Sequence, residues 1–161
     1  LCVLVARRSG AAEIVATDLS DFTLRIARQN GADGAVNVDQ TPERMAAYEE
    51  NKGYFDVLFE CTGVAQALAG GIAALRPGGT VVQLGLGGDM QIPVQTMTTK
   101  EIQFRGSFRF HEEFFTGVEL MQKSLIDVKP LITHTVELDD SESGFQLASD
   151  RSQSVKVQIA F

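Results

Sequence analysis

The sequence predicts an α/β protein built on a parallel, doubly wound sheet. Short runs rich in Val, Ile and Phe alternate with helical stretches along the chain. Parallel strands require crossover connections, which are nearly always right-handed helices, and the alternation supplies such a helix after most runs. A length of 161 residues with 44% hydrophobic and 22% charged residues fits one globular domain with a sizeable core.

The expected elements are read from hydrophobic periodicity and from the residues that cap or stop each run. Strands are expected at residues 13–18, 34–38, 54–60, 80–88, 101–110, 130–138 and 154–161. Helices are expected at residues 1–9, 21–31, 41–53, 64–79, 112–124 and 141–149. Gly31 ends the second helix, and Thr41 is placed to cap the third with Pro42 at its first position. Pro77 and Gly78 are expected to stop the fourth.

Charge and hydropathy exclude several classes of partner. The formal net charge is −7 and Arg7-Arg8 is the only adjacent basic pair, so no nucleic-acid partner is expected. The apolar runs are shorter than a membrane span, and the first residues lack the order of a signal peptide, which predicts a soluble cytoplasmic protein without a membrane partner. Cys2 and Cys61 have no CxxC spacing and are expected to be buried as small hydrophobic residues.

Ligand-binding residues are expected where the strands end, because open parallel sheets bind ligands beyond the carboxyl ends of their strands. Asp18 ends the first expected strand. An acidic residue there can accept hydrogen bonds from the adenosine ribose hydroxyls and repels a 2′-phosphate, which favours NAD over NADP. Asp18 equally fits an acidic residue that begins the next helix, so this position alone leaves both interpretations open.

Three further loops follow strands of the same expected sheet. ECTG at residues 60–63 offers a glycine that lets backbone approach a ligand and a threonine hydroxyl that can bond to it, although a simple turn uses the same residues. LGLGG at residues 84–88 has three glycines within four positions, which favours a ligand-facing loop. In GSFRF at residues 106–110, Arg109 is either an exposed salt-bridging arginine or a contact to an anion or cofactor.

No GxGxxG phosphate loop occurs in the chain, although the four loops together favour a dinucleotide site. Residues 1–9 read as the helix that follows such a loop, and Asp18 lies at the distance that places the last glycine just before Leu1. We therefore expect the first strand of the fold to precede this chain. Because that strand is central in the doubly wound order, the isolated chain is expected to expose two strand edges and to be marginally stable.

Five stretches carry a family resemblance across nearly the whole chain. They read EIVATDLSDFTLRIARQNGAD, GYFDVLFECTG, LRPGGTVVQLGLGG, KEIQFRGSFRF and VKPLITHTVEL. Together they resemble the cofactor-binding half of the zinc-dependent medium-chain alcohol dehydrogenases, in the branch of the sorbitol and sugar-acid dehydrogenases. The resemblance implies a Rossmann-type NAD-binding domain without its first strand over residues 1–130. Residues 131–161 would then return toward a catalytic domain outside the chain.

The resemblance implies a set of cofactor-binding residues, namely Asp18, Cys61, Thr62, Gly63, Leu84, Gly85, Leu86, Phe108 and Arg109. Asp18 would hold the adenosine ribose, residues 61–63 would line the cofactor groove, and residues 84–86 would border the nicotinamide ribose. Phe108 and Arg109 would reach the reactive end of the cofactor and the substrate. Thr23 stands where sorbitol dehydrogenases often carry an arginine near the adenine, which weakens adenine stacking and leaves NAD as the expected cofactor.

The implied activity is hydride transfer from a secondary alcohol of a sugar acid or polyol to NAD, with zinc as Lewis acid. The zinc ligands of the family belong to the preceding catalytic domain. No catalytic or metal-binding residue is therefore expected here, and this chain alone is expected to be inactive. His111, His134 and Cys61 match no zinc spacing and are expected to be two partly exposed histidines and one core cysteine. The resemblance also implies a homo-oligomer, either dimer or tetramer.

Three alternatives stay open on the residues. A zinc-independent quinone-reductase-like enzyme usually replaces the ribose acid with a small residue, whereas Asp18 is acidic here. A methyltransferase would carry acidic or aromatic residues after its fourth strand, where this chain has ECTG at residues 60–63. A nonenzymatic nucleotide-binding module fits the same pattern, because fold does not dictate function.

Overall fold

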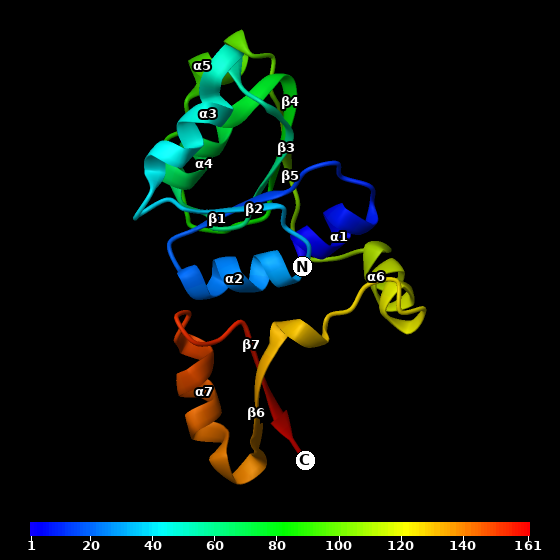
Figure 1. Ribbon diagram of the computed structural model, residues 1–161. Helices are drawn as coiled ribbons and strands as arrows, with labels where there is room; N and C mark the ends of the chain where they lie inside the picture. Colours follow the sequence, from blue (N-terminus) through cyan, green and yellow to red (C-terminus); the bar gives the residue numbers. More distant parts are fainter. The chain divides into compact units, whose positions relative to one another are not determined.

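The computed structural model describes residues 1–161, which form two compact units. The first contains residues 1–42 and 112–161, and the second contains residues 43–111. Every strand pair is parallel, which confirms the predicted α/β class, but the strands form three sheets of two, three and two strands (Figure 1). No helix is both long and apolar enough to cross a membrane.

The amino-terminal part of the first unit is a parallel strand pair with two helices. Its elements are α1 (Cys2–Arg8), β1 (Val15–Asp18), α2 (Asp21–Gln29) and β2 (Gly34–Asn37). β1 pairs with β2 in an unbroken register, and Asp18 lies opposite Asn37 at the carboxyl end. The Ser20 hydroxyl accepts a hydrogen bond from the Thr23 amide, which fixes where α2 begins.

The Arg7 side chain ties α1 to the segments that precede β1 and β2. Its guanidinium donates to the Ala11 carbonyl (2.9 Å) and the Gly31 carbonyl (2.8 Å), and it forms an ion pair with Asp33. The Asp33 carboxylate also accepts a hydrogen bond from the Ile14 amide at 2.8 Å. The Ile14 amide and the Arg7 guanidinium together hold the pKa of Asp33 below its usual value.

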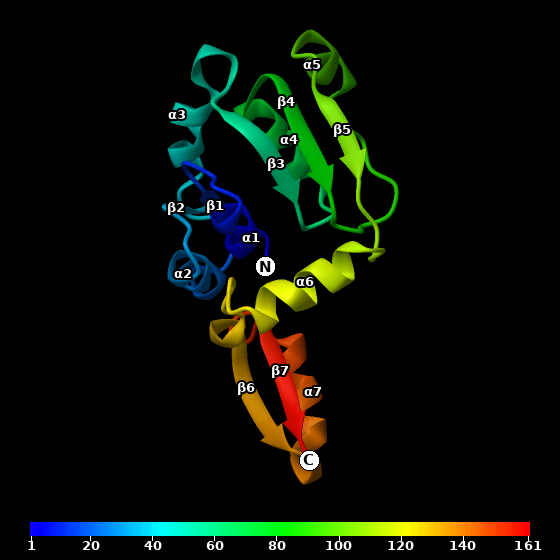
Figure 2. The same ribbon diagram turned by 90° about the vertical axis from the view of Figure 1, so that its right-hand side faces the viewer.

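The carboxyl-terminal part of the first unit is one helix followed by a strand, a helix and a strand. Its elements are α6 (Glu113–Gln122), η3 (Lys129–Leu131), β6 (Ile132–Glu137), η4 (Leu138–Asp140), α7 (Ser141–Ser149) and β7 (Lys156–Ala160). β6 and β7 pair in parallel with α7 beside them (Figure 2). A Cβ added at Gly144 would lie 2.8 Å from the Val136 side chain, so α7 packs closely on β6. The expected helix at 141–149 is confirmed with the same bounds.

The second unit is a three-stranded parallel sheet in the order β3-β4-β5. Its elements are η1 (Pro42–Met45), α3 (Ala46–Glu49), η2 (Glu50–Lys52), β3 (Phe55–Glu60), α4 (Ala65–Ala74), β4 (Leu75–Gln83), α5 (Val94–Thr99) and β5 (Gln103–Gly106). The first residue of η1 belongs to the first unit. Leu68, Ile72, Leu75 and Val81 form the buried core between α4 and the sheet, with Leu58 and Met97 packed against it.

Two expected helices of the second unit differ from prediction. The helix expected at 41–53 is a short α-helix between two 3₁₀ turns, because Asn51 and Lys52 adopt left-handed backbone angles. The Thr41 hydroxyl donates to the Asn37 carbonyl. α4 ends at Ala74, earlier than Pro77, and the following residues begin β4. Leu75 already has extended backbone angles, so the helix stops before the residue that Pro77 restricts, which is Arg76.

Two adjacent glycines in α4 are expected to respond in opposite ways to alanine. A Cβ at Gly70 meets nothing within 4 Å, whereas a Cβ at Gly71 would lie 2.5 Å from the Leu58 side chain. Gly70→Ala should raise the free energy of unfolding by about 0.5–1 kcal/mol. Gly71→Ala should lower it by about 1 kcal/mol or more, because Leu58 must leave its packed position. Urea denaturation of both variants tests this, and equal shifts would contradict the packing of α4 on β3.

Candidate functional site

Three loops of the second unit begin at one edge of its sheet, one after each of β3, β4 and β5. Glu60, Gln83 and Gly106 lie side by side at the ends of β3, β4 and β5. The Glu60 carbonyl accepts hydrogen bonds from the Leu84 and Gly85 amides at 2.8 and 2.9 Å. The Ser107 amide donates to the Gln83 carbonyl at 2.9 Å. The strands therefore end level with one another, and the loops after them begin together, as the sequence predicts.

The first two loops touch backbone against backbone. A Cβ added at Gly85 would lie 2.1 Å from the Gly63 nitrogen, and a Cβ added at Gly87 would lie 1.8 Å from the Gly63 carbonyl oxygen. A Cβ at Gly63, whose φ is +71°, would lie 2.5 Å from the Leu86 carbonyl carbon. Only glycine permits this approach. The glycines predicted to face a ligand thus also serve the contact between the two loops.

The carboxylate of Glu60 organises the turn after β3. Glu60 is 3% exposed. It accepts hydrogen bonds from the Thr62 amide (2.7 Å), the Thr62 hydroxyl, the Gly63 amide (2.9 Å) and the Gln83 side-chain amide (2.5 Å). Burial raises the pKa of Glu60, but hydrogen bonds from Thr62, Gly63 and Gln83 together outweigh it and leave the pKa below its usual value. The carboxylate is therefore held ionised.

Gln83 connects that carboxylate to the second loop. Its side-chain Nε2 donates both to Glu60 and to the Gly85 carbonyl at 2.9 Å. Its Oε1 is buried and has no hydrogen-bond partner. Neither Glu60 nor Gln83 was among the residues that sequence reasoning selected for the site. A charged residue at the end of an apolar strand was the available signal for Glu60, and nothing in the sequence signals Gln83.

The side chains predicted to line the cofactor groove differ in how freely they face solvent. Leu86 is 76% exposed and Leu84 is 37% exposed. The Thr62 hydroxyl is engaged within its own turn, because it donates to Glu60 and accepts from the Val64 amide at 3.0 Å. Cys61 is exposed, so the expectation of a core cysteine is wrong, because the residue follows the strand and lies in the loop. Cys2 is half-buried.

Arg109 follows β5 in a backbone conformation that non-glycine residues seldom adopt. Its φ is +58°, in the left-handed region. Its guanidinium lies over the ring of the exposed Phe108, with 4.9 Å between the guanidinium carbon and the ring centroid. This cation–π contact orients a positive charge on the loop after β5.

Asp18 belongs to the first unit, and the three loops belong to the second. One of its carboxylate oxygens accepts a hydrogen bond from the Ser20 amide at 2.9 Å. Beside it on β2, the buried Asn37 donates to the Leu19 carbonyl and to the Asp21 carboxylate. The turn after β1 is thus fixed by local hydrogen bonds. The structure brings residues 61–63 and 84–87 together, and Arg109 lies in the same unit. Asp18 lies in the first unit, in a turn that its own hydrogen bond with Ser20 fixes.

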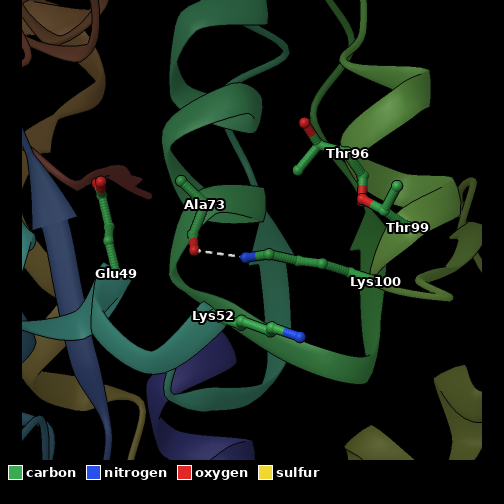
Figure 3. A pocket seen from close by; sticks show the side chains of 6 residues that line it. All are labelled: Glu49, Lys52, Ala73, Thr96, Thr99 and Lys100. Atoms are coloured by element: carbon green, nitrogen blue, oxygen red, sulfur yellow. Dashed lines mark hydrogen bonds between the residues drawn. The ribbon is translucent and has the colours of Figure 1, made fainter.

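One hollow of the second unit lies away from the ends of β3, β4 and β5. Figure 3 shows this hollow of about 410 Å³, lined by residues that precede β3 and β5 or end α4, namely Glu49, Lys52, Ala73, Thr96, Thr99 and Lys100. The Lys100 ammonium donates to the carbonyls of Ile72, Ala73 and Leu75, so it caps α4. Burial lowers the pKa of Lys100, and Glu49 partly offsets this. Lys100, which lines this hollow, therefore has a structural role.

Neither histidine lies beside the thiol of Cys61 in a metal-binding arrangement. His111 is exposed in the second unit with Cys61, whereas the half-buried His134 belongs to the first. The structure holds no group of three or more His, Cys, Asp or Glu side chains that could bind a metal ion. The residues of this chain therefore do not fit a zinc site.

Comparison with known proteins identifies the family. Residues 1–123 match the family described as zinc-binding dehydrogenase. The chain belongs to this family. It is 38% identical over 162 residues to L-idonate 5-dehydrogenase (NAD(P)(+)) of Escherichia coli strain K12, a match that covers 100% of this chain and 47% of that protein. It is 34% identical to sorbitol dehydrogenase of Gallus gallus, covering 98% and 45%.

Solved structures of the zinc-binding dehydrogenase family share the fold. The crystal structure of Escherichia coli L-idonate 5-dehydrogenase matches with a TM-score of 0.92 over 99% of this chain and 46% of that one. The structure of 2R,3R-butanediol dehydrogenase from Bacillus subtilis matches with a TM-score of 0.87 at 26% identity, covering 99% and 46%. The chain spans about half the length of the curated relatives it matches. The expected family and fold class are confirmed.

The buried carboxylate predicts how stability responds to acid. Because the folded-state pKa of Glu60 lies below its unfolded value, its contribution to stability is present above pH about 4.5 and is lost as the pH falls through the folded value. Asp33 and Asp150 add contributions of the same sign. The unfolding free energy, measured by urea titration, should therefore decrease less between pH 5 and pH 3 in Glu60→Gln than in the wild type. A Glu60→Gln curve parallel to that of the wild type would contradict the ionised, hydrogen-bonded carboxylate.

Proposed function

We propose that this chain binds NAD within a zinc-dependent dehydrogenase that oxidises a secondary alcohol of a sugar acid or polyol, with L-idonate to 5-ketogluconate as the first reaction to assay. The observation that carries the proposal is the set of three loops fixed level with one another by Glu60 and Gln83. Membership of the zinc-binding dehydrogenase family and 38% identity to an L-idonate 5-dehydrogenase support it.

Each group of predicted residues has a role in this proposal. Asp18 accepts hydrogen bonds from the adenosine ribose through the carboxylate oxygen that the Ser20 amide leaves free. Cys61, Thr62 and Gly63 line the groove. The exposed Leu84 and Leu86, with Gly85 between them, border the nicotinamide ribose. The loops of the second unit suit a dinucleotide because they offer glycine backbone and exposed apolar side chains.

The reactive end of the site is assigned to the loop after β5. Phe108 and Arg109 reach the nicotinamide and the substrate, and the guanidinium held over Phe108 presents its donors to an anion or to hydroxyl groups. When bound, NAD supplies the acceptor for the hydride. The zinc ligands lie outside this chain, so no chemical step is assigned to a metal held by residues 1–161. A cytoplasmic homo-oligomer, dimer or tetramer, completes the proposal.

Equilibrium binding of the two dinucleotides tests the proposal. NAD and NADP are titrated separately into the full-length natural protein that contains residues 1–161, with the heat of binding or the displacement of fluorescent NADH as the signal. We expect saturable binding of NAD at one site per subunit and weaker binding of NADP, because a 2′-phosphate would meet the Asp18 carboxylate. Absence of NAD binding, or tighter binding of NADP, would contradict the proposal.

A further inference from the structure

We propose that Glu60 and Gln83 form a positioning pair that couples the loops after β3 and β4, so that NAD affinity depends on this pair although neither side chain touches the cofactor. The inference rests on the proposed function. It starts from the convergence of hydrogen-bond donors from the loop after β3 and from the last residue of β4 on a single buried carboxylate. The pair is defined as the side chains of Glu60 and Gln83, joined by the 2.5 Å hydrogen bond from Nε2 to Oε2.

The groups around the Glu60 carboxylate require a charged acceptor. One oxygen takes the amide and hydroxyl of Thr62, and the other takes the amide of Gly63 and the Nε2 of Gln83. All four are used as donors, and a carboxylate is acceptor-only when ionised. An amide at this position would turn an NH2 group toward the backbone N–H of Thr62 or of Gly63, whichever oxygen it replaces. The geometry is therefore specific to glutamate in its ionised form.

The Gln83 side chain carries the constraint from the first loop to the second. Its Nε2 binds the Gly85 carbonyl as well as Glu60, and the backbone carbonyl of Gln83 accepts from the Ser107 amide. The three loops that are proposed to contact NAD thus share one connected set of hydrogen bonds. Loss of the Gln83 amide would leave the backbone hydrogen bonds from Leu84 and Gly85 to the Glu60 carbonyl in place, but it would remove the bridge between the Glu60 carboxylate and the Gly85 carbonyl. Small shifts in a preorganised site weaken binding.

Because one side-chain oxygen of Gln83 has no hydrogen-bond partner, a substitution at Gln83 can distinguish a positioning role from a purely structural one. A buried acceptor without a donor destabilises the fold, so stability alone does not account for a glutamine at this position. Gln83→Met keeps the length and removes both the bridging donor and the unpartnered oxygen. Loss of the unpartnered oxygen raises the free energy of unfolding, and loss of the donor to the Glu60 carboxylate lowers it, so the free energy of unfolding should change little while the coupling between the loops is lost. A residue that served stability alone would show no such separation.

The test compares Glu60→Gln and Gln83→Met with Gln103→Met in the full-length natural protein that contains residues 1–161. Gln103 is an exposed glutamine on β5 whose side chain accepts only from Arg105. We expect the dissociation constant for NAD to rise roughly tenfold or more in Glu60→Gln and roughly three- to tenfold in Gln83→Met, with Gln103→Met unchanged. In turnover with a saturating alcohol, the change should fall on the KM for NAD more than on kcat.

The outcomes separate the inference from the function it rests on. Failure of the wild type to bind NAD would overturn the proposed function. Wild-type NAD affinity in both variants would overturn only the positioning pair, as would a loss of affinity in Gln83→Met that is matched by a fall in melting temperature. If Glu60→Gln does not fold, Gln83→Met alone decides the question, because its fold is expected to be intact.

Discussion

Gly85→Ala is expected to lower NAD affinity on the order of 100-fold, and Gly87→Ala to have a similar effect. The reason is steric, since the added methyl carbons would lie 2.1 Å and 1.8 Å from backbone atoms of Gly63. Backbone cannot rotate away as a side chain can, so one of the two loops must leave its position. Titration with NAD measures the effect, and circular dichroism establishes that each variant still contains its sheet.

Gly106→Ala is the matched control for these two variants. Gly106 also lies at the end of a strand, β5, at the same edge of the sheet, and a Cβ there meets nothing within 4 Å. Its substitution should change NAD affinity less than about twofold, because no atom has to move. Equal effects of Gly85→Ala and Gly106→Ala would show that close approach between the first two loops does not shape the site.

Asp18→Asn is expected to shift the preference between dinucleotides by roughly 10- to 100-fold toward NADP. Asparagine keeps an oxygen that can accept from the Ser20 amide, so the turn after β1 should persist. It removes the negative charge that would strengthen hydrogen bonds from the ribose hydroxyls and repel a 2′-phosphate. The ratio of dissociation constants for NAD and NADP is the measured quantity.

Asp21→Asn distinguishes a ribose contact from a general effect of negative charge. Asp21 is the first residue of α2, close in sequence to Asp18, and its carboxylate accepts from the Asn37 side chain. Its substitution should leave the ratio of the two dissociation constants within about twofold of the wild type. An equal shift in both variants would favour the alternative that Asp18 is simply an acidic residue at the start of a helix.

The sequence was sufficient to place most elements because their hydrophobic periodicity reflects burial within each element. The helix at Ser141–Ser149 and the strand ends at Asp18 and Glu60 coincide with prediction. Backbone angles at single residues are not visible in that periodicity. Asn51 and Lys52 therefore interrupt an expected helix, and α4 gives way to β4 before Pro77.

The candidate site was only partly predictable, for a related reason. Glycines after strands signal that backbone is approached closely, but they do not say by what. In the structure, Gly85 and Gly87 face the backbone of Gly63. The roles of Glu60 and Gln83 depend on the register that sets β3 beside β4, which joins residues 23 positions apart in the chain. No local pattern encodes that register, so the pairing of Glu60 with Gln83 could not be predicted from the sequence, although a charged residue at the end of an apolar strand singles out Glu60.

The most direct test of NAD binding at the three loops is the change in backbone amide chemical shifts when NADH is added to the full-length natural protein that contains residues 1–161. We predict that the largest chemical-shift changes fall on the amides of Thr62, Gly63 and residues 84–86. The chemical shifts of the amides around the hollow at Lys52 and Lys100 should not change. Changes centred on that hollow, or no saturable changes at all, would contradict the assignment of these loops to the cofactor.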